Sequence, residues 1–141
     1  MITDFIKQFT TEEVIDIEHV IKIDRRFYLA DPKDDILIQK SDPTYTGTYL
    51  GEEVKKKFKP SFILLDLIGK HTDKKVRVND KAAWLFICGR DILDSKANFP
   101  DRTIVLVTSE NDEVLGYGIF WEGKISVKNI LDRGDFLRKE R

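Results

Sequence analysis

A predicted hairpin in the C-terminal half constrains the fold of this chain more than any other segment. Residues 103–108 form a nearly unbroken run of β-branched and aliphatic side chains, which is typical of a strand. Asn111-Asp112 predicts a turn, and residues 114–120 predict a second strand that returns antiparallel to the first. Glycines alternate at 116 and 118, so one face of the second strand is bare. Another part of the molecule is therefore expected to approach it closely.

Short elements surround this hairpin. Residues 75–78 alternate as a strand, and residues 81–88 predict a short helix that is capped by Asn79 or Asp80 and ended by Gly89. A polar loop follows over 94–101, and residues 124–128 predict a further strand. Many short strands with one short helix, in about 67 residues, favour a small closed β-barrel over a layered α/β sheet.

The N-terminal half has a mixed pattern. Residues 20–23 and 26–30 predict two strands joined by a two-residue turn, and residues 44–50 predict a strand that ends at Gly51. Apolar residues recur at helical spacing over 62–68, with Ser61 as the N-cap and Gly69 as the stop. Residues 10–17 stay open between helix and strand, because Thr10 and Glu13 have the spacing of a capping box whereas the apolar residues after them alternate.

A polar connector over 71–74 separates the two patterns. It coincides with a change of charge: residues 1–50 carry 6 Lys/Arg and 10 Asp/Glu, whereas residues 51–141 carry 18 and 15. The balances are −4 and +3, which together give the net charge of −1. We therefore predict two closely packed subdomains, residues 1–73 and residues 74–141.

The composition is that of a folded chain, with 41% hydrophobic and 35% charged residues. The longest apolar run, residues 62–65, is far shorter than the roughly 20 residues that a membrane-spanning helix needs. The N-terminus lacks the basic start and apolar core of a signal peptide. We expect a soluble, cytoplasmic protein that does not contact a membrane.

Signatures of catalysis are sparse. The sequence contains neither the glycine-rich dinucleotide fingerprint nor the phosphate-binding loop ending in Gly-Lys-Ser/Thr. Cys88 lies among apolar residues, so we expect a buried thiol and not a nucleophile. His19 and His71 are too few for a three-histidine zinc site, and the paired carboxylates lie in polar stretches instead of the apolar pocket that an acid–base pair needs. The chain is predicted to be no enzyme, with no metal and no cofactor.

The closing segment combines apolar anchors with a series of cations. The cations of residues 124–141 are Lys124, Lys128, Arg133, Arg138, Lys139 and Arg141. Lysine and arginine side chains supply the sequence-independent part of nucleic-acid affinity by contacting phosphates. On charge alone, a C-terminal segment whose cations contact only solvent is as consistent with the sequence as a phosphate-binding one.

Several of these segments together resemble a PUA domain, the RNA-binding module named for pseudouridine synthases and archaeosine transglycosylases. The resemblance rests on the short helix that ends at Gly89, on residues 114–118, and on Asp132-x-Gly134-x-Phe136-Leu137-Arg138. Residues 51–68 and 75–78 resemble the pre-PUA domain of the ribosome-biogenesis family typified by nuclear import protein seven. The resemblance covers about residues 18–141, and the short N-terminus suggests an archaeal-type member.

The resemblance implies an α+β fold, in which a mixed α/β pre-PUA domain over residues 1–73 precedes a small PUA-type β-barrel over residues 74–141. It implies a monomeric, non-catalytic protein that docks on structured or U-rich pre-ribosomal RNA, in rRNA processing for the large subunit, together with other ribosome-assembly proteins. The cations that match the family's RNA contacts, with their neighbours, are Arg138, Lys139, Arg141, Arg133, Lys128, Lys75 and Arg77.

Two other functions remain open. PUA domains also serve RNA-modifying enzymes, so the chain could be an accessory RNA-binding subunit of an rRNA- or tRNA-modification enzyme. What precedes residue 75 is, however, several times smaller than the catalytic domains of such enzymes. The other alternative is a protein-binding scaffold, whose cationic patch would meet an acidic partner.

Overall fold

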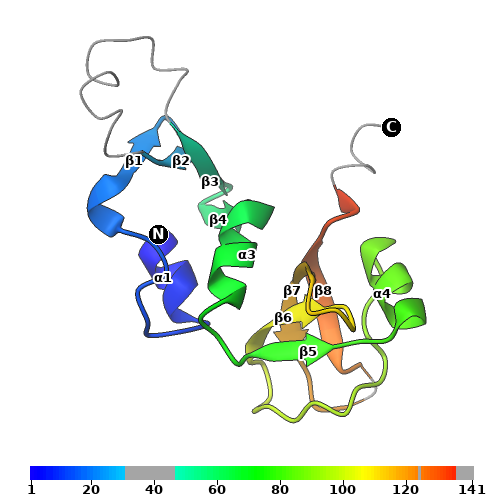
Figure 1. Ribbon diagram of the computed structural model, residues 1–141. Coiled ribbons are helices and arrows are strands. Elements are labelled where there is room, and N and C mark those ends of the chain that lie inside the picture. The colour runs from blue at the N-terminus through cyan, green and yellow to red at the C-terminus, as the bar shows by residue number, and fades with distance from the viewer. Residues whose placement is uncertain (31–46, 124, 136–141) are drawn as a thin grey trace. The chain divides into compact units, whose positions relative to one another are not determined.

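The computed structural model describes residues 1–30, 47–123 and 125–135, and the chain divides into two compact units, Met1–His71 and Thr72–Arg141 (Figure 1). The first unit contains, in order, α1 (Ile2–Lys7), the 3-10 turn η1 (Ile17–His19), β1 (Val20–Ile23), β2 (Arg26–Leu29), β3 (Thr48–Val54), β4 (Lys57–Pro60) and α3 (Phe62–Gly69). The second contains β5 (Lys75–Arg77), α4 (Asp80–Ile87), β6 (Ile104–Thr108), β7 (Val114–Phe120) and β8 (Val127–Asp132). Each unit has one four-stranded sheet, so the α+β fold class is confirmed.

The sheet of the first unit is an antiparallel meander in the order β1-β2-β3-β4. Helix α3 follows directly and packs on β3, with Leu64, Leu65 and Ile68 fully buried. The Ser61 hydroxyl accepts a hydrogen bond from the Leu64 amide at 3.2 Å, which satisfies one of the free N–H groups at the helix start. The predicted helix and its cap are therefore confirmed.

An aromatic cluster joins α1 to this sheet. The ring of Phe58 on β4 lies 5.3 Å from that of Phe5 on α1 and 5.5 Å from that of Phe27 on β2, measured between ring centroids. These separations suit edge-to-face packing of aromatic rings. Helix α1 had no counterpart among the predicted elements, because six residues are too few to show a helical period.

Several predicted boundaries in the first unit are wrong. Strand β3 continues through Gly51 to Val54, and a strand that was not predicted, β4, follows a two-residue turn. In residues 10–16 neither the helix nor the strand forms. The Thr10 hydroxyl instead accepts a hydrogen bond from the Glu12 amide at 3.1 Å, within a bend. The predicted strand over 44–50 is seen from Thr48 onward, and residues 44–46 lie outside the described residues.

The sheet of the second unit has the order β5-β6-β7-β8, with β5 parallel to β6 and the other pairs antiparallel. An isolated bridge pairs Ile92 with Val127 at the start of β8. One core collects buried side chains from every strand of this sheet and from α4. Its buried members are Val76, Val78, Phe86, Ile92, Val105, Val107, Leu115, Phe120 and Val127.

The predicted hairpin is confirmed as β6 and β7, and its bare glycine face has a clear reason. A Cβ atom added at Gly116 would fall on the carbonyl oxygen of Leu131, and one at Gly118 would fall on that of Lys128. Both acceptors belong to the backbone of β8, which is thus the close neighbour that the alternate glycines predict. Tyr117, between them, is buried, and this burial raises the pKa of its phenol to about 12.

Two other predictions for the second unit are wrong. The strand expected over 124–128 begins at Val127 and continues to Asp132, because it pairs with β7 on both sides of a register shift between Tyr117 and Gly118. Residue 124 lies outside the described residues. Cys88, expected to be buried, is exposed at the C-terminal end of α4. Phe86 is the side chain that α4 buries completely, and a residue two positions later lies about 200° further around the helix.

Candidate nucleic-acid interface

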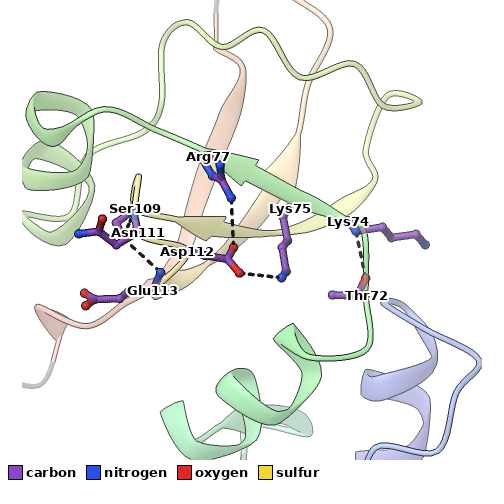
Figure 2. A network of polar contacts seen from close by, with 8 residues as sticks. All are labelled: Thr72, Lys74, Lys75, Arg77, Ser109, Asn111, Asp112 and Glu113. Atoms are coloured by element: carbon purple, nitrogen blue, oxygen red, sulfur yellow. Dashed lines mark hydrogen bonds and ion pairs between the residues drawn. The ribbon is translucent and has the colours of Figure 1, made fainter.

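Two of the predicted cations, Lys75 and Arg77, lie on β5 beside the tip of the β6–β7 hairpin (Figure 2). The parallel register sets Arg77 opposite Thr108, immediately before that tip. Asp112 in the turn faces both cations. Its Oδ2 lies 3.5 Å from Lys75 Nζ, and its Oδ1 lies 3.8 Å from Arg77 Nη2. The structure thus brings these two predicted cations together around one carboxylate.

The hairpin tip that presents Asp112 is tightly hydrogen-bonded. The Ser109 hydroxyl accepts from the amides of Asn111 and Glu113, each at 3.2 Å, and the Asp112 amide donates to the Ser109 carbonyl at 3.0 Å. Asp112 has a φ of 63°, a left-handed conformation that aspartate and asparagine tolerate better than most residues. The carboxylate is therefore held in place on the β5 side of the sheet (Figure 2).

The ion pair between Arg77 and Asp112 is weak, because it is long and open to solvent. The Arg77 side chain is 64% exposed and that of Asp112 50% exposed. Exposed pairs of this kind contribute about 0–1 kcal/mol, since water and salt screen them. Two cations and one carboxylate leave one net positive charge at this site, and the Arg77 guanidinium stays accessible to an anion.

The predicted cations Lys128 and Arg133 lie on and just after β8. Lys128 is exposed, with the exposed Ile130 two positions later on the same strand. The Arg133 guanidinium is tied to the fold, because its Nε donates to the Val114 carbonyl at 2.6 Å and its amide donates to the Leu115 carbonyl at 2.9 Å. Arg133 therefore helps to hold the chain after β8 against β7, a role that charge alone did not indicate.

The predicted cations do not form one cluster among the described residues. Lys75 and Arg77 are on β5, and Lys128 is on β8, at the other end of the strand order. Arg138, Lys139 and Arg141 lie outside the described residues.

A hollow of about 360 Å³ lies beside Lys128, and sequence reasoning missed it. The other residues that line it are Asp91, Trp121, Glu122, Gly123 and Ile125. The ring of Trp121 also has the guanidinium of Arg102 over it, 5.4 Å from the ring centroid. One feature of the sequence could have indicated this hollow: Trp121 directly follows the predicted strand over 114–120.

A second hollow, of about 710 Å³, lies along α4 and the segment after it. It is lined by Asn79, Lys81, Ala82, Leu85, Gly89, Arg90, Asp91, Ile92, Leu93 and Asp94. Leu93 is 69% exposed, and the charged residues of the lining are two cations and two carboxylates, Lys81, Arg90, Asp91 and Asp94. Asp91 borders both hollows.

Asn129 on β8 fixes the segment shared by the two hollows. Its Nδ2 donates to the carbonyl oxygens of Phe86 at 2.9 Å and Arg90 at 3.2 Å, and it lies 3.1 Å from Asp132 Oδ2. Its backbone amide donates to Asp91 Oδ1 at 2.8 Å. One side chain thus joins the end of α4 to β8.

Within the ranges 1–30, 47–123 and 125–135, no group of three or more His, Cys, Asp or Glu side chains could hold a metal ion. Over the same ranges, every helix is too short or too polar to cross a bilayer. His19 and His71 each face one carboxylate, of Asp16 at 2.7 Å and of Glu12 at 3.0 Å.

Comparison with known proteins places this architecture in a family. Residues 74–141 match the family described as the UPF0113 PUA domain. A UPF0113 protein of Archaeoglobus fulgidus is 30% identical over 119 residues, and the match covers 74% of this chain and 68% of that protein. This chain belongs to the UPF0113 family. The PUA part of the predicted resemblance is therefore confirmed.

A solved structure supports the same fold. The UPF0113 chain is similar to a conserved PUA domain protein from Thermoplasma acidophilum, with a TM-score of 0.59 and 16% identity. The match covers 99% of this chain and 91% of that one. At this identity the similarity supports the fold and not the function.

Proposed function

We propose that this UPF0113 protein is an RNA-binding factor without catalytic activity, which docks on pre-ribosomal RNA through its PUA domain. The match of residues 74–141 to the UPF0113 PUA domain carries the proposal, because a PUA domain implies a capacity to bind RNA. The narrower assignment to ribosome assembly, as an archaeal-type relative of the nuclear import protein seven family, rests on the sequence resemblance described above. It also implies assembly proteins as further partners, a monomeric chain and a cytoplasmic location.

The chemistry of the described surface suits such a role. Lys128 and Arg77 present exposed positive charge, which phosphate oxygens can neutralise. Apolar surface lies beside Lys128, where Trp121 and Ile125 line the smaller hollow. Single-stranded RNA is recognised by pairing phosphate contacts with stacking of splayed bases on such surfaces.

Removing the carboxylate that screens Lys75 and Arg77 is expected to strengthen RNA binding. Asp112→Asn keeps the shape of the side chain and suits the left-handed backbone there. It frees one unit of positive charge, which corresponds to about fivefold tighter binding of single-stranded RNA at 0.1 M salt. The measurement is the Kd for a labelled oligouridylate by fluorescence anisotropy.

Glu113→Gln is the matched control for this variant. It removes the same charge from the same hairpin tip, and Glu113 makes no ion pair among the described side chains. Its effect on Kd should be the smaller of the two. Equal effects would show that the β5 cluster has no special part in RNA binding.

The predicted contacts of the closing segment are tested by Arg138→Ala combined with Lys139→Ala. If both cations meet phosphates, the slope of log Kd against log salt falls by about 1.4 on single-stranded RNA. This decrease in slope corresponds to about 25-fold weaker binding at 0.1 M salt, provided that the salt titrations of the wild type and the variant give the same Kd at 1 M salt. If the double variant binds RNA with unchanged affinity, Arg138 and Lys139 are not part of the interface.

Two measurements separate the alternatives: the salt titration tests the scaffold, and an assay for modified nucleotides tests the enzyme. A scaffold for an acidic protein would bind oligouridylate weakly and would keep its affinity for RNA when the cations are removed. A catalytic role would appear as modified nucleotides after incubation of the chain with rRNA and a methyl donor. Either result would contradict the proposed function.

A further inference from the structure

The turn between β3 and β4 is an unusual place for lysine. Val54 pairs with Lys57, so the hairpin loop consists of Lys55 and Lys56 alone. Both residues have positive φ, 51° and 66°, which is the pattern of a type I′ turn. Such turns strongly prefer Asn-Gly, because glycine has no Cβ and asparagine tolerates the left-handed region, whereas most other side chains are strained there. Two successive lysines are therefore a costly choice for this loop.

The charge at this turn is open to solvent and makes no ion pair with the part of the chain that the structure describes. Lys55, Lys56 and Lys57, here called the lysine tip, are all exposed. No ion pair reaches the lysine tip from residues 1–30, 47–123 or 125–135. Three exposed like charges at the end of a hairpin concentrate positive potential there.

Two glutamates on β3 could have neutralised the lysine tip, but they are engaged elsewhere. Glu53 Oε2 lies 3.3 Å from Lys22 Nζ on β1, and Glu52 Oε2 lies 3.9 Å from Arg26 Nε on β2. Both carboxylates are therefore directed across the sheet, away from the loop. The sequence run Glu52-Glu53-Val54-Lys55-Lys56-Lys57 suggests charge cancellation, whereas the fold separates the two signs.

We propose that the lysine tip is a second phosphate-contact site for RNA, in the first unit and distinct from the PUA domain. Strained backbone persists where the surrounding structure enforces it, and it concentrates at functional sites. Here the strained turn places two ammonium groups at the end of the hairpin, where the residues that favour a type I′ turn (Asn, Asp and Gly) supply no positive charge. Lysine acts as a point charge toward phosphate and needs no fixed orientation, so the site would be independent of RNA sequence. This proposal rests on the proposed RNA-binding function.

The decisive variant is Lys55→Asn combined with Lys56→Gly, in the full chain. It supplies the preferred type I′ residues while it removes two cations. We expect the Tm to rise by about 4 °C, because the strain is relieved. We also expect about 25-fold weaker binding of oligouridylate at 0.1 M salt, with the log–log salt slope lower by about 1.4. A change that stabilises the fold and weakens binding cannot be explained by unfolding.

Two further variants complete the experiment. Lys55→Arg with Lys56→Arg keeps both charges and should retain the affinity within about twofold. Lys7→Gln with Lys70→Gln removes two exposed lysines elsewhere in the same unit, and we expect less than about threefold loss.

Each other outcome is informative. If the wild-type chain binds oligouridylate and the Asn-Gly variant binds it equally well, the lysine tip is no contact site, although the proposed function stands. If the Lys7 and Lys70 control loses as much affinity as the Asn-Gly variant, only net charge matters and the site is again excluded. A lower Tm for the Asn-Gly variant would overturn the argument from strain. If the wild-type chain does not bind RNA, both the proposed function and this proposal are wrong.

Discussion

Gly118→Ala is expected to lower the free energy of unfolding of the PUA unit by about 4 kcal/mol, a large loss for the addition of one methyl group. The added Cβ would fall on the carbonyl oxygen of Lys128 and lie 2.7 Å from Cγ1 of Val127, which is fully buried. A backbone oxygen in a strand cannot rotate away as the end of a flexible side chain can. Strands β7 and β8 must therefore separate, which weakens the ladder in which Gly118 pairs with Asn129.

Urea denaturation followed by circular dichroism measures this change. Gly123→Ala is the matched control, because an added Cβ there meets nothing within 4 Å, whereas its φ of 140° makes any side chain strained. Gly123→Ala should therefore cost about 1 kcal/mol, for a purely conformational reason. Equal costs at the two positions would contradict the close approach of β8 to Gly118.

Asn129→Ala is expected to cost about 3 kcal/mol of unfolding free energy. The substitution removes the donor to two carbonyl oxygens, those of Phe86 and Arg90, and the contact with the carboxylate of Asp132. Asp132 is 1% exposed, so water cannot readily replace the lost donor. The end of α4 and residues 90–94, which line the larger hollow, should open more easily than the rest of the PUA unit.

Two variants show whether hydrogen bonding is the cause. Asn111→Ala, at the exposed tip of the β6–β7 hairpin, should change the unfolding free energy by less than about 0.5 kcal/mol. Asn129→Asp keeps the shape but replaces the donor by a carboxylate beside Asp132 and two carbonyl groups. It should be at least as destabilising as Asn129→Ala at neutral pH and should recover on acidification, when a protonated carboxyl can donate again.

Faster amide exchange in residues 88–92 of Asn129→Ala would confirm the local opening. A variant as stable as the wild type, with unchanged exchange, would show that Asn129 does not hold α4 to β8.

The elements predicted correctly are those whose signals are local. Ser61 and Asn79 both accept the hydrogen bond expected of an N-cap, from the amides of Leu64 and Ala82. The β6–β7 hairpin was predicted because its strands are apolar and its turn lies between them. The exact ends of β3 and β8 were missed, because a strand ends where its partner strand ends, and the partner is remote in sequence.

The candidate site was predictable as a set of residue types but not as an arrangement. Lys128 is exposed on β8 as expected, yet the hollow beside it depends on Asp91 and Trp121, which come from two other segments. Arg133 was predicted only as a cation of the RNA-contacting set, and its bond from Nε to the Val114 carbonyl could not be read from its charge. Such partners are set by strand pairing over long sequence separations, and a single sequence does not show them.

The alternate glycines 116 and 118 already predict the close approach of another part of the chain, and the clusters of lysine and arginine in residues 51–141 are visible without any structure. Which of these charges are screened depends on how the strands pair in the folded chain. Asp112 faces Lys75 and Arg77 because β5 pairs with β6, whereas Glu52 and Glu53 face away from the lysine tip because β3 pairs with β2. Screening falls with the distance between side chains, and the pairing of strands sets those distances.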